Sequence, residues 1–396
     1  MTGSKPDWWR GAAAFRLVRD LVAAELQRLR PARTPDWSSW TAATPLDDRP
    51  GGLGCDSLEL ITIATAVARG YGLDRAGIDD YLLARRTLGD WAALIGEARK
   101  GDDSEIIFFT SGSTGAPKAV PHRLDDLRAE MAHFLDRYGA PDRILAAVPA
   151  HHIYGFLFTV LAPAMAGAPV IDIRHSLPAG IGGKAEAGDW IVGHPVFWAA
   201  ARTATPAPDA LALSSTGPLP PDTATALGDA GWRGVEIYGS TETAGVGVRA
   251  FGAARFDLLP LWTRAGEDML RHRDSERTEP PPDLLDWVDD GAFRVRGRRD
   301  GAVQVGGHNV FPDKVRACLL EHDAVADAAV RLMRPDEGDR LKACIVPATP
   351  DTDAGQLRAA LESWTAARLT PPEQPRAWRF GPALPRTAMG KPADWD

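Results

Sequence analysis

The sequence is poor in cysteine, has no basic excess and contains no long apolar run. Its only cysteines, Cys55, Cys318 and Cys344, are widely spaced and form no Cys-x-x-Cys pair. This spacing excludes a disulfide framework and offers no structural zinc signature. The formal net charge of -8 leaves no positive surplus to neutralise nucleic-acid phosphates. We therefore expect no nucleic-acid partner.

The N-terminus has scattered charges and no long apolar stretch after a basic head. No signal peptide or membrane span is visible, so we expect a cytoplasmic protein. What the chain does have is length: its 396 residues with 44% hydrophobic content are enough for two or three domains with cores of their own.

A polar joint at residues 100–103 and a charged, glycine-flanked joint at 298–301 predict three domains, at residues 1–101, 102–298 and 299–396. The first should be a helical bundle with helices at 12–29, 57–71 and 88–95, where apolar residues recur at steps of three and four. The second alternates short apolar runs with helical stretches, which is typical of a layered α/β domain. Its predicted strands are 144–148, 170–173, 190–192, 211–214 and 235–238. The third should be a small α+β domain, with strands at 303–305, 325–331 and 342–346.

The most informative motif spans residues 110–118 and follows a predicted strand at 106–109. Glycines let backbone N–H groups approach a polyanion, and hydroxyls and an ammonium add donors and charge. We predict a phosphate-binding loop, the alternative being a flexible Ser/Gly turn. It is not a Walker loop, because Pro117 precedes the lysine and Ala119 follows it. The expected phosphate-binding residues are Thr110, Ser111, Gly112, Ser113, Thr114, Gly115 and Lys118.

This string resembles the phosphate-binding signature of the adenylate-forming superfamily, which includes acyl- and aryl-CoA ligases, nonribosomal peptide adenylation domains and luciferases. The resemblance implies a layered α/β core with a small, mobile α+β C-terminal domain, and ATP and Mg²⁺ as cofactors. Residues 238–242 match the superfamily's Tyr-Gly-x-Thr-Glu motif. Carried over, Tyr238 and Gly239 would lie near adenine, Thr241 would touch phosphate, and Glu242 would hold Mg²⁺ through hard oxygen ligands. The local alternative is a helix N-cap followed by a first-turn glutamate.

Residues 149–156 resemble the superfamily's substrate-pocket motif in its His-x-Tyr form, found in hydroxycinnamate-CoA ligases. The resemblance places His152 near the carboxylate of the acid and Tyr154 along its aromatic or enoyl body. Gly217 stands where the superfamily has a small-residue loop that borders adenine. Asp283 stands at the family's interval before Gly291 and would bind ribose, with Asp286 as the alternative carboxylate.

Three further matches fall near or beyond residue 298. The Gly-Arg-x-Asp match at 297–300 implies a ribose contact for Arg298 and a hinge at Asp300. Gly306 and Gly307 resemble the loop that lines the pantetheine tunnel. The match at 385–391 implies that Lys391 contacts the carboxylate and α-phosphate and stabilises charge as pyrophosphate leaves.

The first hundred residues resemble an acyl carrier protein, because residues 53–60 contain the Asp-Ser-Leu motif in which a serine bears phosphopantetheine. Ser57 would be that attachment site; the alternative is an N-cap on an ordinary helix.

The whole pattern predicts an AMP-forming ligase that activates an aryl or unsaturated carboxylic acid as its adenylate. Transfer to the phosphopantetheine thiol of a fused or separate acyl carrier protein is the favoured second step, as in polyketide or aryl-pigment biosynthesis. Alternatives are an aryl- or acyl-CoA ligase that uses free CoA, and a non-catalytic module that binds adenylate and docks a carrier.

Overall fold

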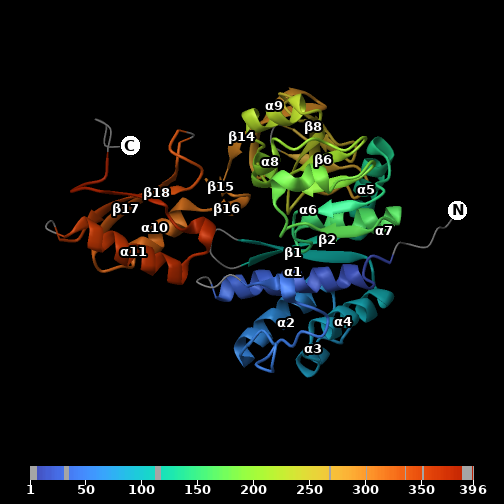
Figure 1. The fold of residues 1–396 in the computed structure, drawn as a ribbon, viewed down its shortest axis with the longest axis horizontal. Helices are drawn as coiled ribbons and strands as arrows, with labels where there is room; N and C mark the ends of the chain where they lie inside the picture. The colour runs from blue at the N-terminus through green and yellow to red at the C-terminus, as the bar shows by residue number, and fades with distance from the viewer. Residues whose placement is uncertain are drawn as a thin grey trace. The chain divides into compact units, whose positions relative to one another are not determined.

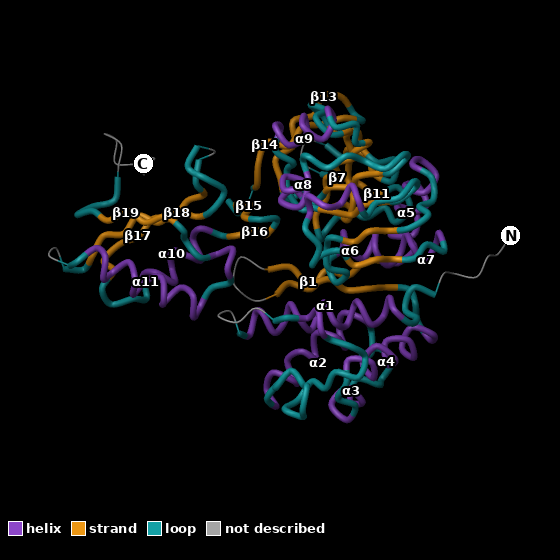
Figure 2. The backbone as a smooth tube through the Cα atoms, in the orientation of Figure 1, coloured by secondary structure: helices purple, strands orange, loops and turns teal. Residues whose placement is uncertain are grey.

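A computed structural model describes residues 7–30, 35–111, 117–266, 269–299, 301–334, 336–349, 352–385 and 395. Contacts between residues divide the chain into two units. The first comprises the described residues of 1–26, 35–110 and 117–297, and the second those of 27–34, 111–116 and 298–396. Figure 1 colours the chain along its length, and Figure 2 shows that both units combine helices and strands.

The first unit contains a nine-stranded mixed sheet. Its strands are β3 (Ile144–Ala146), β4 (Val170–Asp172), β5 (Trp190–Gly193), β6 (Leu211–Ser214), β7 (Arg233–Ser240), β8 (Ala244–Ala250), β9 (Phe256–Leu258), β13 (Asp283–Asp289) and β14 (Ala292–Arg298). Their order is β13-β14-β9-β8-β7-β6-β5-β3-β4. The five strands from β4 to β7 run parallel, and β8 then pairs antiparallel with β7. All five strands predicted in this region are confirmed.

The inner parallel strands belong to a layered structure. Every residue of β5 and β6 is buried, as expected for short apolar strands covered on both faces. Helices α8 (Pro195–Ala201) and α9 (Pro221–Asp229) contribute Trp198 and Leu227 to the core that contains Ile191 and Ala212 of these strands. Elsewhere Phe134 of α5 (Leu124–Tyr138) packs edge-on against Phe158, with ring centroids 4.9 Å apart.

Four helices precede the sheet: α1 (Ala12–Leu29), α2 (Ser57–Tyr71), α3 (Asp80–Ala84) and α4 (Leu88–Gly101). The first two have the predicted bounds, and the third predicted helix continues to Gly101. Buried Asp20 of α1 accepts a hydrogen bond from the Ala150 N–H at 2.7 Å and pairs with Arg174 at 2.9 Å. These long-range contacts explain why the helices share one unit with the sheet. The acyl-carrier-like character of residues 1–101 stays a prediction.

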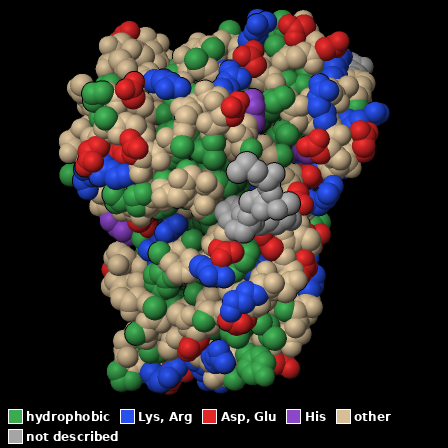
Figure 3. Space-filling view, turned by 90° about the vertical axis from the view of Figure 1, so that its right-hand side faces the viewer, with side chains coloured by type: hydrophobic (Ala, Val, Ile, Leu, Met, Phe, Trp, Pro, Cys, Tyr) green, Lys and Arg blue, Asp and Glu red, His purple; other side chains and the backbone are tan. Residues whose placement is uncertain are grey.

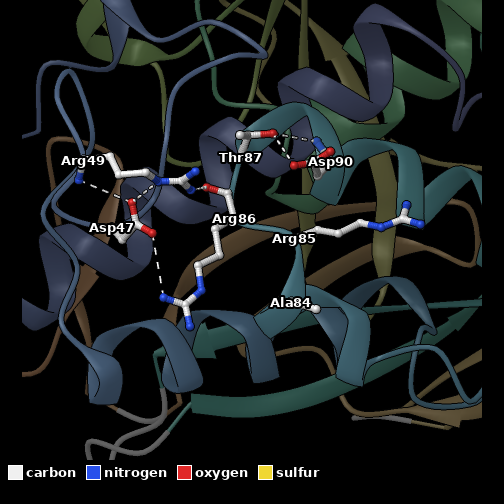
Figure 4. Close-up of a pocket in the computed structure, with 7 residues that line it drawn as sticks. All are labelled: Asp47, Arg49, Ala84, Arg85, Arg86, Thr87 and Asp90. Atoms are coloured by element: carbon white, nitrogen blue, oxygen red, sulfur yellow. Dashed lines mark hydrogen bonds and ion pairs between the residues drawn. The ribbon is translucent and has the colours of Figure 1, made fainter.

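A polar pocket of about 480 Å³ lies beside the start of α4 (Figure 4). Arg49 donates to Asp47 at 2.7 Å and to the carbonyl of Arg86 at 3.2 Å. Thr87 caps α4 by accepting from the Asp90 N–H at 3.1 Å. Because these contacts connect the loop before α2 to the segment between α3 and α4, we interpret the cluster as structural.

The predicted phosphate-binding motif lies on a hairpin. Strands β1 (Glu105–Ser111) and β2 (Pro117–Arg123) form a two-stranded sheet of their own, and α1 runs alongside it in Figure 1. The predicted strand at 106–109 is confirmed, with Ile106 and Phe108 buried. Residues 112–116, which include the motif residues Gly112, Ser113, Thr114 and Gly115, lie outside the described residues. A smaller antiparallel sheet contains β10 (Trp262–Arg264), β11 (Leu270–His272) and β12 (Thr278–Glu279).

The second unit is a small α+β structure, as predicted. Its elements are β15 (Val303–Val305), β16 (His308–Val310), α10 (Pro312–Leu320), β17 (Val325–Leu332), β18 (Leu341–Pro347), α11 (Ala354–Arg368) and β19 (Ala377–Phe380). Strands β17 and β18 pair antiparallel, and β19 joins β18 in parallel. Val315 and Leu319 of α10 and Leu361 of α11 enter one core with Ala343 and Ile345 of β18.

Acidic and basic side chains are interspersed on the face shown in Figure 3, without a continuous basic area. Among the helices of the described residues, none has the length and hydropathy needed to cross a bilayer.

Candidate active site

Several predicted site segments meet at one edge of the main sheet. Strands β3, β5, β6 and β7 are parallel neighbours, and their carboxyl ends lead into residues 147–152, His194, 215–217 and 239–242. In open α/β sheets this edge is where ligands bind. The sheet therefore brings together the predicted acid-pocket, adenine and phosphate segments, and it adds His194, which the sequence did not single out.

The Tyr-Gly-x-Thr-Glu motif ends β7 and forms the turn into β8. The pairing of these strands shifts register between Tyr238 and Gly239, next to the predicted site. A Cβ atom at Gly239 would lie 2.1 Å from the carbonyl oxygen of Ala244, so only glycine fits. Ser240 and Thr243 hydrogen-bond through both side chains and backbone, at 3.0 to 3.2 Å. Glu242 is half-buried on this turn. Because β8 follows, the alternative of a helix N-cap here is wrong.

Tyr238 and Asp283 lie together although 45 residues separate them in the chain. The Tyr238 hydroxyl donates to Asp283 Oδ2 at 2.9 Å, and Asp283 is only 9% exposed. The Tyr238 ring contacts Phe256 and Phe293, with centroids 5.7 and 5.3 Å away. The predicted adenine-binding and ribose-binding residues thus share one hydrogen bond. Asp286, the alternative ribose ligand, instead lies 3.5 Å from Arg296 and is exposed.

The loop after β6 has unusual backbone geometry. Thr216 has φ +76°, a left-handed conformation that is strained for a β-branched residue. Ser215 before it is buried and donates to the Ile237 carbonyl of β7 at 2.9 Å. This bond keeps Gly217, the next residue, near the start of the Tyr238–Thr243 turn.

The His-x-Tyr segment begins the short helix α6 (Ile153–Phe156), which continues through a π-helical turn, Leu157–Leu161, into α7 (Ala162–Ala166). His152 is exposed at the start of α6, and its ring lies 4.1 Å from that of His151. Tyr154 is buried, which raises the pKa of its phenol well above the ordinary value. Its hydroxyl has no hydrogen-bond partner within the described residues. A buried hydroxyl without a protein partner needs another one, such as a ligand or a water molecule.

The sequence analysis missed two residues next to this site, the buried His122 and the half-buried Arg277. His122 on β2 lies 2.6 Å from the carbonyl oxygen of Thr241, and Arg277 approaches the carbonyls of Glu242 and Thr243. His122 lies four residues after Lys118 on the same strand, but its partner Thr241 is 119 residues away along the chain, so no local pattern identifies the contact. Arg277 has no local signal, since it lies more than thirty residues from the turn and follows no recognisable motif.

The residues present fit a magnesium ion that arrives with nucleotide phosphates. Within the described ranges no group of three or more His, Cys, Asp or Glu side chains gathers as a metal cage. Mg²⁺ characteristically takes one or two protein carboxylates and completes its shell with phosphate oxygens and water. The half-buried Glu242 carboxylate, on a turn with the Thr241 hydroxyl beside it, is suited to that arrangement.

The remaining predicted residues belong mostly to the second unit. Gly306 and Gly307 connect β15 to β16 with φ of +58° and +82°, the two positive values of a tight hairpin turn that favours glycine. Arg298 is half-buried at the end of β14. Asp300 and Lys391 lie outside the described residues, as do the phosphate-loop residues Gly112–Gly115. Of that loop's motif, Lys118 is described and is exposed on β2.

Comparison with known families assigns the class of protein. Residues 64–267 match the family model described as AMP-binding enzyme, and residues 314–391 match that of the AMP-binding enzyme C-terminal domain. The chain belongs to this family of adenylate-forming enzymes and is an AMP-forming acid–thiol ligase, as the sequence predicted.

Individual relatives match over nearly the whole chain. A 4-coumarate–CoA ligase of Rhodobacter capsulatus is 38% identical, over 96% of this chain and 99% of the relative. A 4-coumarate–CoA ligase of Halorhodospira halophila is 37% identical, over 95% and 97%. Among solved structures, the amide bond synthetase of Marinactinospora thermotolerans superposes with a TM-score of 0.60 at 19% identity, over 96% of this chain and 93% of that one. A double mutant of the o-succinylbenzoate CoA synthetase of Bacillus subtilis gives 0.58 at 22%, over 72% and 67%. These structures confirm the predicted fold.

Proposed function

We propose that this ligase activates a 4-coumarate-like aryl acid with ATP and passes the acyl group to the thiol of CoA. The observation that carries this proposal is the near full-length similarity to two proteins named 4-coumarate–CoA ligase. The His-x-Tyr segment at the carboxyl edge of the sheet supports it, because the buried Tyr154 side chain combines an apolar ring with a hydroxyl. An aromatic side chain of this kind suits a planar aromatic acid.

In the proposed first half-reaction, nucleotide and acid bind at the carboxyl edge of the sheet. Tyr238 and Asp283 hold the adenosine part, while Thr241, Lys118 and the hydroxyls and glycines of 110–115 hold phosphates. Mg²⁺ bound at Glu242 would neutralise phosphate charge. His152 lies near the acid's carboxylate, which attacks the α-phosphorus and releases pyrophosphate. Lys391 stabilises the charge that develops, as an ammonium can at a site shielded from water.

The second half-reaction transfers the acyl group from AMP to a thiol sulfur. The names of the relatives support CoA as the acceptor better than the acyl carrier protein that the sequence analysis favoured. The match with the relative from Rhodobacter capsulatus covers 96% of this chain. Most of residues 1–101 therefore belongs to the region that the two ligases share. Gly306 and Gly307 are proposed to line the path of the pantetheine arm, with Arg298 on the ribose and Asp300 as the hinge between the two half-reactions.

The test is pyrophosphate release from ATP with a panel of acids: 4-coumarate, cinnamate, benzoate, 2-succinylbenzoate and acetate. We expect release with the first two acids and, after CoA is added, a thioester detectable by mass spectrometry. Glu242→Gln should abolish release, because the amide cannot supply the negative charge that Mg²⁺ needs. Glu276→Gln, at an exposed carboxylate nearby, is the matched control. Turnover of acetate alone would overturn the proposed substrate class, and activity only with a carrier protein would overturn CoA as the acceptor.

A further inference from the structure

Side chains from other segments contact the backbone carbonyls of the turn between β7 and β8. His122 Nε2 lies 2.6 Å from the carbonyl oxygen of Thr241. The two Nη atoms of Arg277 lie 3.4 and 3.2 Å from the carbonyl oxygens of Glu242 and Thr243. Carbonyl oxygens only accept hydrogen bonds, so His122 must carry its proton on Nε2. Three consecutive carbonyls, those of the two predicted nucleotide ligands and of the residue after them, are therefore fixed from outside the turn.

The chain is also anchored where it leaves the turn. The Gly245 N–H donates to Glu130 Oε2 of α5 at 3.1 Å, and Trp262 Nε1 of β10 donates to the Gly245 carbonyl at 2.8 Å. The Arg277 guanidinium lies over the Trp262 ring, 5.2 Å from its centroid, in a cation–π contact. All three side chains are buried or half-buried. Glu130, Trp262 and Arg277 thus form one cluster connected through Gly245 and the cation–π contact; together with His122, these residues are called the cluster below.

His122 connects this turn to the other predicted phosphate-binding segment. It lies on β2, whose first residues close the phosphate-binding motif, and its ring makes an edge contact with Phe108 of β1 at 5.8 Å. Strands β1 and β2 form a sheet separate from the nine-stranded sheet, so the contact of His122 with the Thr241 carbonyl connects the hairpin directly to the turn. His122 is 1% exposed, and burial lowers its pKa to about 4, which keeps the ring neutral.

We propose that His122 and Arg277 are positioning residues that aim the Thr241 hydroxyl and the Glu242 carboxylate at the triphosphate and its magnesium ion. The physical reason is that fixing a carbonyl fixes its peptide plane, and this plane sets the Cα–Cβ direction of the residues on either side of it. A supported turn also pays less entropy on binding, because its side chains are already oriented. This proposal deepens the proposed function and rests on it.

Changes in the cluster should affect binding of the phosphates and magnesium ion more than binding of the adenosine part of the nucleotide. The adenosine end is held by Tyr238 and Asp283, whose hydrogen bond does not involve the cluster. AMP lacks the β- and γ-phosphates and needs no magnesium ion, so its binding depends less on where Thr241 and Glu242 point. A residue that acted only through the stability of the fold would weaken both nucleotides alike.

The experiment measures binding of ATP with MgCl₂, and of AMP, to the full chain by isothermal titration calorimetry, and the KM for ATP in pyrophosphate release. His122→Leu removes the donor, whereas His122→Gln offers an amide N–H near the position of Nε2. Arg277→Met removes both donors, and Arg277→Lys keeps the charge without the fork. Leu227→Ala, in the core between α9 and the sheet, is a matched destabilising control away from the turn.

We expect His122→Leu and Arg277→Met each to weaken Mg-ATP binding about tenfold, as for loss of a buried hydrogen bond, and AMP binding less than about twofold. His122→Gln should recover most of the lost Mg-ATP affinity. Leu227→Ala should bind Mg-ATP as tightly as the wild-type protein does. Equal weakening of Mg-ATP and AMP binding in the removal variants overturns the proposal. Unchanged Mg-ATP binding in a folded His122→Leu or Arg277→Met protein also overturns it. If a removal variant does not fold, an Arg277→Lys protein with wild-type Mg-ATP affinity and KM, or one that binds Mg-ATP and AMP equally more weakly, overturns it. Failure of the wild-type protein to bind Mg-ATP would instead contradict the proposed function.

Discussion

The Tyr238 hydroxyl donates a hydrogen bond to Asp283 Oδ2 at 2.9 Å and so joins the end of β7 to the start of β13. Strand β13 is the outermost strand on one side of the sheet, four strands from β7. The bond therefore connects two distant strands at one point. It fixes the phenol ring that is proposed to lie near adenine against the carboxylate that is proposed to bind ribose.

Tyr238→Phe should weaken AMP binding about threefold to tenfold, the usual effect of losing one partly buried hydrogen bond. The ring stays, and with it the contacts to Phe256 and Phe293, so the fold should be kept. Calorimetric titration with AMP measures the effect, and Tyr81→Phe, at an exposed tyrosine of α3, is the control. Unchanged affinity in Tyr238→Phe would remove this pair from the nucleotide site.

Glu130 gives a prediction about pH. Burial raises its pKa to about 7, against an ordinary value of 4.5. Between pH 4.5 and pH 7 the Glu130 carboxyl keeps its proton in the folded protein but has lost it in the unfolded chain. The free energy of unfolding therefore falls as the pH rises through this range. Glu130→Gln should flatten this slope and raise stability at pH 8 by on the order of 2–3 kcal/mol. Denaturant melts at several pH values measure it.

The control for that series is Glu97→Gln, at an exposed carboxylate on α4 that pairs with Lys100. It should follow the wild-type pH dependence. A Glu130→Gln protein with the wild-type slope would show that the buried carboxyl does not retain its proton near neutral pH.

Lys391→Ala should remove most adenylate formation and spare thioester formation from a preformed acyl-adenylate. The reason is that its ammonium is proposed to act only while pyrophosphate leaves. Single-turnover assays of the two half-reactions separate these effects. Equal loss in both half-reactions would assign Lys391 another role.

Much of the architecture could be predicted because the signals are local. Buried strands such as 190–193 and 211–214 are short runs of apolar residues, and helices 12–29 and 57–71 have a clear apolar face. The Ser-Thr-Glu sequence after Gly239 was ambiguous, since hydroxyls beside a carboxylate suit a helix N-cap and a hairpin turn equally. Pairing with β8 decides between them, and that pairing is a tertiary interaction.

The site was predictable only where a motif carried it. Asp283 was identified by its interval from Gly291, and the structure adds its contact with Tyr238. His122 and Arg277 approach the turn from 119 and about 35 residues away along the chain, so no sequence window contains both partners. Such contacts depend on how β2 and the segment before β12 pack, which periodicity does not determine.

The last prediction concerns Ser57 and the resemblance to acyl carrier proteins. Ser57 is exposed and is the first residue of α2, where Asp56 is the N-cap and accepts from the N–H groups of Leu58 and Glu59 at 2.9 Å. Glu59 completes the capping box by accepting from the Asp56 N–H at 3.0 Å. The ordinary N-cap is therefore present, and it leaves the Ser57 hydroxyl where a phosphopantetheinyl transferase can reach it.

If residues 1–101 retain carrier function, incubation with CoA and a promiscuous transferase should add one phosphopantetheine to the wild-type protein and none to Ser57→Ala. Intact mass measures the addition, and ATP with 4-coumarate should then add an acyl group to the arm. Ser4→Ala keeps the predicted attachment site and is the control. A protein that gains no mass, yet forms the CoA thioester, would show that α1–α4 serve the ligase only as structure, because the exposed serine then has no acyl chemistry of its own.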